Sequence, residues 1–323
     1  MSLIKNPSEI EEKKNLVMMI YGTPGAGKTT VALSAPSPVL IDTDGGVSRT
    51  HTAHRCPTVQ VTKWEDVNAA LDEIAAAPFK SIIVDTVGKL LDFMGDFIIR
   101  NNPKMRKFDG TLSLQGYGVR KQMFREFVKR CMLMGRNVIF VAHASEEKVG
   151  DDYAVRPIVG GSSMADIMME LDLLGLLDNI AGKRVLLWGN DGTTALAKSF
   201  YAKNTCFLPN VMEVPVVADA NGNIIRQNDF LSGVLAAYAE SQKKKEATNA
   251  AYEKLIAECA EHISACKNDK DLNKLRKELG SDKFENIYDS KLVNGTRLMA
   301  KAKELGFTFS KVDNAFVKAN ATA

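Results

Sequence analysis

The spacing of hydrophobic residues differs between the first two-thirds of the chain and the remainder. Through the first two-thirds, short β-branched runs alternate with longer amphipathic stretches, the pattern of a mostly parallel sheet covered by helices. We expect strands at 16–21, 39–42, 58–62, 81–85 and 137–142. Later runs at 171–177, 184–188 and 194–201 are separated by turn signals such as 190–192, so antiparallel hairpins should extend the sheet. Helical patterns fill 64–76, 87–100, 117–134 and 229–239.

The pattern changes after residue 240. Residues 241–249 are polar and include a lysine triplet, which predicts a linker. From residue 250 the apolar positions recur with helical spacing. We therefore expect an α/β domain over 1–240 and a small all-helical C-terminal domain over 250–323.

Composition narrows the class of protein. A chain of 323 residues that is 45% hydrophobic can bury a sizeable core. The apolar run at 16–20 is too short to cross a bilayer, and residues 1–14 lack the apolar region of a signal peptide. Five scattered cysteines suit a reducing compartment, so we expect a cytoplasmic protein without a membrane partner. The net charge of +3 is too mild to indicate nucleic-acid binding by itself.

One segment matches the P-loop pattern G-x-x-x-x-G-K-[ST] in full, between an expected strand and a helix-compatible stretch. Its backbone N–H groups would cradle phosphates, Lys28 would reach the β- and γ-phosphates, and the Thr29 hydroxyl would ligate Mg²⁺. The alternative is a glycine-rich turn that binds nothing. The pattern predicts a site for ATP and Mg²⁺ made of Gly22, Thr23, Pro24, Gly25, Ala26, Gly27, Lys28, Thr29 and Thr30.

Two expected strands end in acids. Asp85 closes the strand 81–85 in the Walker B arrangement and would hold the Mg²⁺ shell together with Thr29, unless it only caps the next helix. The strand 39–42 leads into Asp42 and Asp44, where a carboxylate can orient the attacking water. Both aspartates could equally cap an ordinary turn.

The order of these segments resembles the RecA-like recombinase core. Residues 41–44 resemble the family's Ile-Asp-Ala-Glu strand, which gives Asp44 the role of catalytic carboxylate, and 84–86 resemble its Val-Asp-Ser Walker B. The strand 137–143 resembles one that ends in a γ-phosphate-sensing Gln, which places His143 as the sensor. The alternative for His143 is a buried, satisfied histidine.

The resemblance covers roughly residues 16–215 and is closest to phage-encoded RecA-like ATPases associated with single-strand annealing. The stretch 145–163, which ends in Gly-Gly, resembles the family's mobile DNA-binding loop, and 102–118 resembles an earlier one. Residues 202–204 resemble the segment whose lysine reaches a neighbouring subunit's ATP, which assigns that role to Lys203 unless it is an ordinary surface lysine.

The sequence departs from the family at three places. Asp44 is one methylene shorter than Glu, His143 replaces Gln, and Thr205 replaces a second interface lysine. The shorter acid must sit closer to the attacking water or act through a second water. A neutral imidazole can still donate one hydrogen bond to a phosphate oxygen.

The two expected loops carry cations and aromatic side chains suited to single-stranded DNA. Phe108, Tyr117 and Tyr153 could stack on bases, although nearby acids dilute the positive charge, and a lid or partner loop is the alternative. Histidine and cysteine clusters at 51–56 and 259–266 do not supply four zinc ligands. The expected DNA contacts are Lys104, Arg106, Lys107, Lys148 and Arg156.

The expected protein is a DNA-stimulated ATPase that acts on single-stranded DNA in phage or prophage recombination. It would assemble as a ring or filament of identical subunits and work with recombination partner proteins. The catalytic set is Lys28, Asp44, Asp85 and His143. One alternative is a small-molecule or nucleotide kinase, which would need a lid with several arginines, and another is a non-hydrolysing ATP-binding switch.

Overall fold

The computed structural model describes residues 13–159, 163–189, 199–281 and 284–319. The chain divides into a unit of Lys13–Ala239 and a second unit that contains the described residues from Glu240 onward. The expected turn at 190–192 and most of the expected strand 194–201 lie outside the described residues.

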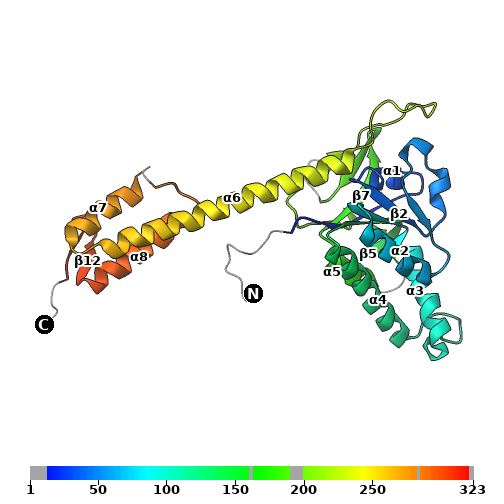
Figure 1. The fold of residues 1–323 in the computed structure, drawn as a ribbon, viewed down its shortest axis with the longest axis horizontal. Coiled ribbons are helices and arrows are strands. Elements are labelled where there is room, and N and C mark those ends of the chain that lie inside the picture. Colours follow the sequence, from blue (N-terminus) through cyan, green and yellow to red (C-terminus); the bar gives the residue numbers. More distant parts are fainter. Residues whose placement is uncertain (1–12, 160–162, 190–198, 282–283, 320–323) are drawn as a thin grey trace. The chain divides into compact units, whose positions relative to one another are not determined.

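A mostly parallel sheet forms the centre of the first unit (Figure 1). Strands β1, β2, β3, β4, β5 and β7 pair in parallel, and β8 and β11 extend the sheet antiparallel beyond β7. The strand order is β11-β8-β7-β1-β5-β4-β2-β3. This confirms the expected α/β fold. The bounds are β1 (Val17–Gly22), β2 (Pro38–Asp42), β3 (Thr58–Gln60), β4 (Ser81–Asp85), β5 (Asn137–Val149), β7 (Leu173–Ile180), β8 (Lys183–Leu187) and β11 (Val211–Glu213).

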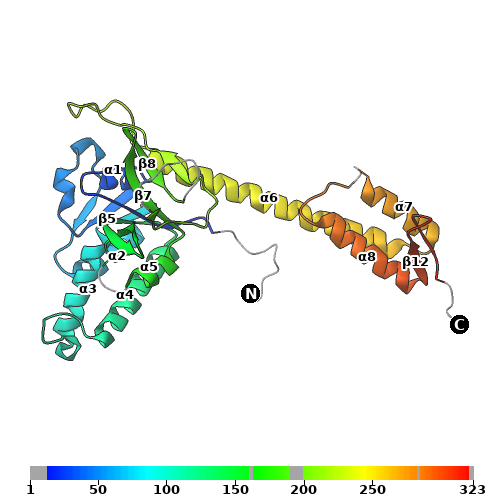
Figure 2. The same cartoon turned by 180° about the vertical axis from the view of Figure 1, so that it is seen from behind.

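Helices cover both faces of the sheet (Figures 1 and 2). Helices α2 (Trp64–Ala76), α3 (Val87–Asn101), α4 (Leu114–Leu133) and α5 (Ser163–Glu170) pack on one face. The short α1 (Lys28–Ala32) and the first turns of α6 (Phe230–Ala265) pack on the other. Because both faces are covered, every residue of β1 is buried, which explains why the strand is a continuous apolar run.

The stretch 145–163 is not the loop that the sequence predicts. Strand β5 continues past the central sheet and pairs antiparallel with β6 (Asp152–Pro157), from Ala144↔Pro157 to Val149↔Asp152. Gly150, at a φ of 66°, supplies the left-handed turn residue. The short strand β9 (Ser199–Phe200) pairs with β6, and β10 (Lys203–Asn204) pairs with β7. The Gly-Gly end of the expected loop falls within 160–162, outside the described residues.

The expected linker is wrong as well, because residues 241–249 lie inside the 36-residue helix α6. This segment has no glycine or proline, and six of its nine residues favour helices: three lysines, one glutamine, one glutamate and one alanine. An ion pair of 3.0 Å joins Lys244 to Glu240 one turn earlier. Residues 241–249 are therefore a solvent-exposed stretch of helix that lacks an apolar face.

The tail is not all-helical. Helix α6 is followed by α7 (Asp269–Gly280) and α8 (Ser290–Glu304), and then by a hairpin of β12 (Phe307–Ser310) and β13 (Ala315–Lys318). The strands form because Phe307 and Phe309 alternate with polar residues, a period of two. The side chains of this unit enclose their own hydrophobic core.

Candidate functional site

The P-loop joins β1 to α1 and needs glycine at three points. Gly25 and Gly27 adopt φ angles of 80° and 91°, in the left-handed region. A Cβ at Gly22 would lie 2.4 Å from the carbonyl oxygen of Leu177 on β7, so no side chain fits there. The loop therefore has the backbone conformation that turns N–H groups toward an anion.

Lys28 is buried at the first position of α1. Its ammonium donates a hydrogen bond of 2.8 Å to the carbonyl oxygen of Thr23, back across the P-loop. Burial lowers the pKa of Lys28, and the nearby Asp85 carboxylate partly offsets that effect. A cation held with so little water around it favours an anionic ligand.

Thr29 and Asp85 form the second part of the site. The Thr29 hydroxyl donates a hydrogen bond of 2.6 Å to Oδ2 of Asp85 at the end of β4. Burial raises the pKa of Asp85, the Thr29 hydrogen bond opposes this, and the charge of Asp42 adds to it. One hydroxyl and one carboxylate are a suitable protein contribution to Mg²⁺, which keeps several waters and phosphate oxygens.

The two acids after β2 have different surroundings. The buried Asp42 accepts hydrogen bonds from the backbone N–H groups of Asp44 (3.3 Å), Gly46 (3.0 Å) and Val47 (3.1 Å). Asp42 is thus the turn cap that the sequence left open as an alternative. Asp44 is held in place by that turn, and its carboxylate pairs with Arg49 at 3.4 Å.

His143 lies at the end of the central part of β5. Strand β5 runs between β1 and β4, and its register with β1 sets His143 opposite Gly22, at the start of the P-loop. Its Nδ1 is buried and has no hydrogen-bond partner among the described residues. This nitrogen argues against the alternative that His143 is a buried histidine whose hydrogen bonds are all made within the protein. It can donate a hydrogen bond to a bound group or accept one from it.

The five residues expected to act on the nucleotide line one cavity of about 520 Å³. The elements that bring them together are the P-loop, α1, and the ends of β2, β4 and β5. These ends meet because the carboxyl ends of parallel strands share one edge of a sheet. The residues in question are Lys28, Thr29, Asp44, Asp85 and His143.

Arg184 lies against the P-loop, next to the residues that line the cavity, and escapes the sequence analysis. It lies on β8, and a Cβ added at Gly27 would be only 2.6 Å from its Nη1 atom, so the guanidinium rests on the P-loop. The side chain is half-buried, and no carboxylate of the described residues pairs with it. Only the strand order, which places β8 next to β7 and β7 next to β1, reveals this approach.

Lys203 already has a partner within its own chain. Its ammonium donates a hydrogen bond of 2.7 Å to the carbonyl oxygen of Met168 in α5. A reach to a neighbouring subunit's nucleotide would have to break this bond. That role stays a prediction.

The first expected DNA segment is a compact turn between α3 and α4. A bridge pairs Arg106 with Leu112, and Leu112 is buried beneath the turn. Phe108 projects fully into solvent at its tip, among the exposed Lys104 and Lys107. Arg120, on the helix that follows, is buried, and its guanidinium stacks on the half-buried Tyr117 ring at 4.7 Å, so this cation is not exposed to DNA.

The second expected DNA segment is the β5/β6 hairpin. Lys148 is exposed on it, and Tyr153 is 49% exposed. Arg156 is paired with Glu147 across the hairpin at 3.3 Å, so its charge is partly neutralised. The hairpin begins directly after His143, whose carbonyl oxygen accepts a hydrogen bond of 2.7 Å from the N–H of Ile158.

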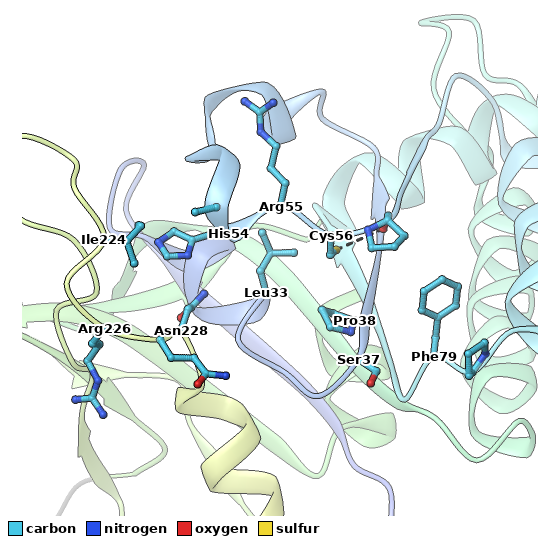
Figure 3. Close-up of a pocket in the computed structure, with 14 residues that line it drawn as sticks. Leu33, Ser37, Pro38, His54, Arg55, Cys56, Phe79, Ile224, Arg226 and Asn228 are labelled. Carbon is cyan, nitrogen blue, oxygen red and sulfur yellow. Dashed lines mark hydrogen bonds between the residues drawn. The ribbon is translucent and has the colours of Figure 1, made fainter.

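A second cavity, of about 660 Å³, lies beside the end of α1 (Figure 3). The His54 ring lies on the side of Ile224 and Asn228, whereas Cys56 lies on the side of Pro38 (Figure 3). The Cys56 thiol donates to the carbonyl oxygen of Pro57 at 3.4 Å, and burial raises its pKa to about 11. In the absence of a bound metal this side chain is therefore a thiol near neutral pH.

Comparison with known proteins agrees with this geometry. The model of a family described as AAA domain matches residues 14–206. A protein of Bacillus subtilis (strain 168), the SPbeta prophage-derived uncharacterized protein YorG, is 23% identical over 244 residues, which are 72% of this chain and 73% of that protein. Within the described residues, no helix combines the length and apolar character needed to cross a membrane.

Proposed function

This chain belongs to the AAA domain family of P-loop ATPases, and from that premise we propose that it binds and hydrolyses ATP with Mg²⁺. The observation that carries the proposal is the convergence of Lys28, Asp44, Asp85 and His143 on one cavity. Two features of the cavity fit a nucleotide: the glycine cradle, and the buried Nδ1 of His143 without a partner among the described residues.

Each side chain takes a role from its position. Lys28 and the P-loop amides hold the phosphates, and Arg184 contacts the phosphate chain from β8. Thr29 and Asp85 hold Mg²⁺, which neutralises phosphate charge when bound. Asp44 orients the attacking water from the turn that Asp42 caps.

We further propose that nucleotide state controls contact with single-stranded DNA through the β5/β6 hairpin. His143 is the last residue of β5 beside the P-loop, and the same strand continues into the hairpin that carries Lys148. A hydrogen bond from His143 to a terminal phosphate would thus connect the nucleotide directly to the hairpin. The exposed Phe108, Lys104 and Lys107 offer a second contact, which combines stacking and charge.

The prophage origin of the related Bacillus protein supports a phage or prophage origin for this chain. The role that we propose for it is recombination in the bacterial cytoplasm. RecA-like organisation, self-assembly into a ring or filament, recombination partner proteins and the reach of Lys203 to a neighbour all belong to this proposal. They rest on the resemblance of the motifs and on their order along the chain.

Steady-state phosphate release with and without single-stranded DNA tests the proposal. We expect Mg²⁺-dependent release from ATP that single-stranded DNA raises several-fold. Turnover only with a small-molecule acceptor would favour a kinase, and tight binding without turnover would favour a switch. Either result contradicts the proposed hydrolase.

A further inference from the structure

The second unit has a groove that the proposed function does not use. It has a volume of about 630 Å³ and lies among α7, α8 and the β12/β13 hairpin. Its apolar wall consists of Leu279, Leu298, Met299, Phe309 and Phe316. Phe309 is half-buried and Met299 is 49% exposed, so the groove opens this small core to solvent. Methionine and aromatic side chains adapt well to a bound apolar group.

A glycine in the middle of α8 opens the groove further. Gly295 lines it, and a Cβ at this position would meet nothing within 4 Å. Glycine destabilises a helix interior relative to alanine, and neither its backbone conformation nor close packing requires it here. Its consequence is open space beside the apolar wall, which leaves room for a bound peptide chain.

The charged residues along the groove all have the same sign. Lys277 and Lys291 are exposed at its rim, and Arg276 is the third cation. Arg276 is fixed, because its guanidinium lies 4.5 Å from the centre of the Phe309 ring and donates a hydrogen bond of 2.8 Å to the carbonyl oxygen of Asn314. None of the described residues that line the groove is acidic.

We propose that this groove binds a short acidic peptide segment of a partner protein, one that carries a bulky apolar side chain. The apolar side chain occupies the space between Met299 and Phe309, and carboxylates of the peptide pair with Lys277 and Lys291. Arg276, whose two terminal nitrogens both donate to Asn314, contributes its positive charge to the same side of the groove. Single-stranded DNA suits the groove less well, since its bases need exposed rings for stacking and the wall offers one half-buried ring.

Fluorescence anisotropy with the full chain tests the proposal. The probe is a labelled synthetic peptide of about ten residues with several aspartates and one phenylalanine, the composition that charge and shape complementarity require. We expect saturable binding that Lys277→Glu and Lys291→Glu each weaken by about tenfold, because each places like charges together. Lys254→Glu, an exposed residue of the same unit outside the groove, is the matched control and should bind as the parent does.

A second variant tests the apolar part of the groove without changing any charge. Gly295→Leu has room for its side chain, favours the helix, and should fill the groove and abolish peptide binding while the thermal unfolding midpoint is kept or raised. Replacing the phenylalanine of the probe by alanine should weaken binding to the same extent as filling the groove. The proposal is overturned if the peptide does not bind, if Lys254→Glu weakens binding as much as Lys291→Glu does, or if the probe without phenylalanine binds equally well.

Discussion

The hydroxyl of Thr29 donates a 2.6 Å hydrogen bond to the carboxylate of Asp85, and this bond joins the start of α1 to the end of β4. The two strands that lead to these residues are not neighbours, since β5 runs between β1 and β4. The bond therefore crosses the end of the part of β5 that lies between β1 and β4, close to His143. It brings the P-loop hydroxyl and the Walker B acid to the separation that a shared Mg²⁺ requires.

Replacing Asp85 by Asn should stabilise the protein in the absence of Mg²⁺ and nucleotide. Burial raises the pKa of Asp85, so the folded chain holds this proton more tightly than the unfolded chain does. The free energy of unfolding consequently falls as pH rises from the ordinary pKa of aspartate through the raised one. Thermal scans at pH 5 and pH 8 should show a larger advantage for Asp85→Asn at pH 8.

The same variant should lose the response to ligand. Mg²⁺ with ATP should raise the melting temperature of the parent chain but leave that of Asp85→Asn almost unchanged, because the charged ligand of the metal is gone. An Asp85→Asn protein that is less stable than the parent at pH 8 would contradict the buried-carboxylate interpretation.

Arg184→Ala should weaken ATP and ADP binding by about tenfold, the usual range for one lost charge-assisted contact. Lys183→Ala is a close control, because Lys183 is the preceding residue, is exposed, and pairs with Glu213 at 2.8 Å rather than with the P-loop. Titration calorimetry gives both affinities. Equal affinities for the two variants would mean that the Arg184 guanidinium merely covers Gly27.

His143→Ala should keep ATP binding within about threefold of the parent but lower hydrolysis by about ten- to a hundredfold, as expected for one lost donor to a developing charge. His143→Gln should restore most of the rate and of the stimulation by DNA, since an amide can donate the same hydrogen bond. Phosphate release is the measurement. A His143→Ala enzyme with normal turnover and normal DNA stimulation would remove His143 from the mechanism.

Lys244→Pro tests the continuity of α6. Proline inside a helix removes a hydrogen bond and clashes with the preceding turn, at a cost of about 3 kcal/mol. We expect a clear loss of helical circular dichroism and a lower unfolding midpoint, with Lys244→Ala close to the parent in both. A proline variant that is indistinguishable from Lys244→Ala would show that 241–249 is a linker after all.

The sequence identified the parts of the site that are local. The P-loop residues are contiguous, and Asp85 and Asp44 follow apolar strands, so pattern and spacing sufficed to propose them. Which acid caps the turn and which faces the cavity could not be read from spacing, because it depends on the direction of the Asp42 side chain.

Two of the elements that the sequence analysis missed share a physical cause. Strand β5 beyond His143 and helix α6 over 241–249 are exposed on most sides, so neither bears the hydrophobic period that reveals an element. Arg184 was missed for a different reason: its approach to Gly27 is set by the strand order, which brings residues 157 positions apart into contact. No local pattern in the sequence encodes such a contact.

The most direct test of the nucleotide site is calorimetric titration of the full chain with Mg²⁺ and ATP, run in parallel on the parent and on Lys28→Ala. The parent should bind one ATP per chain, and Lys28→Ala should bind at least about a hundredfold more weakly, since it loses the one cation buried in the P-loop. No binding to the parent, or equal affinity for the two proteins, would contradict the account.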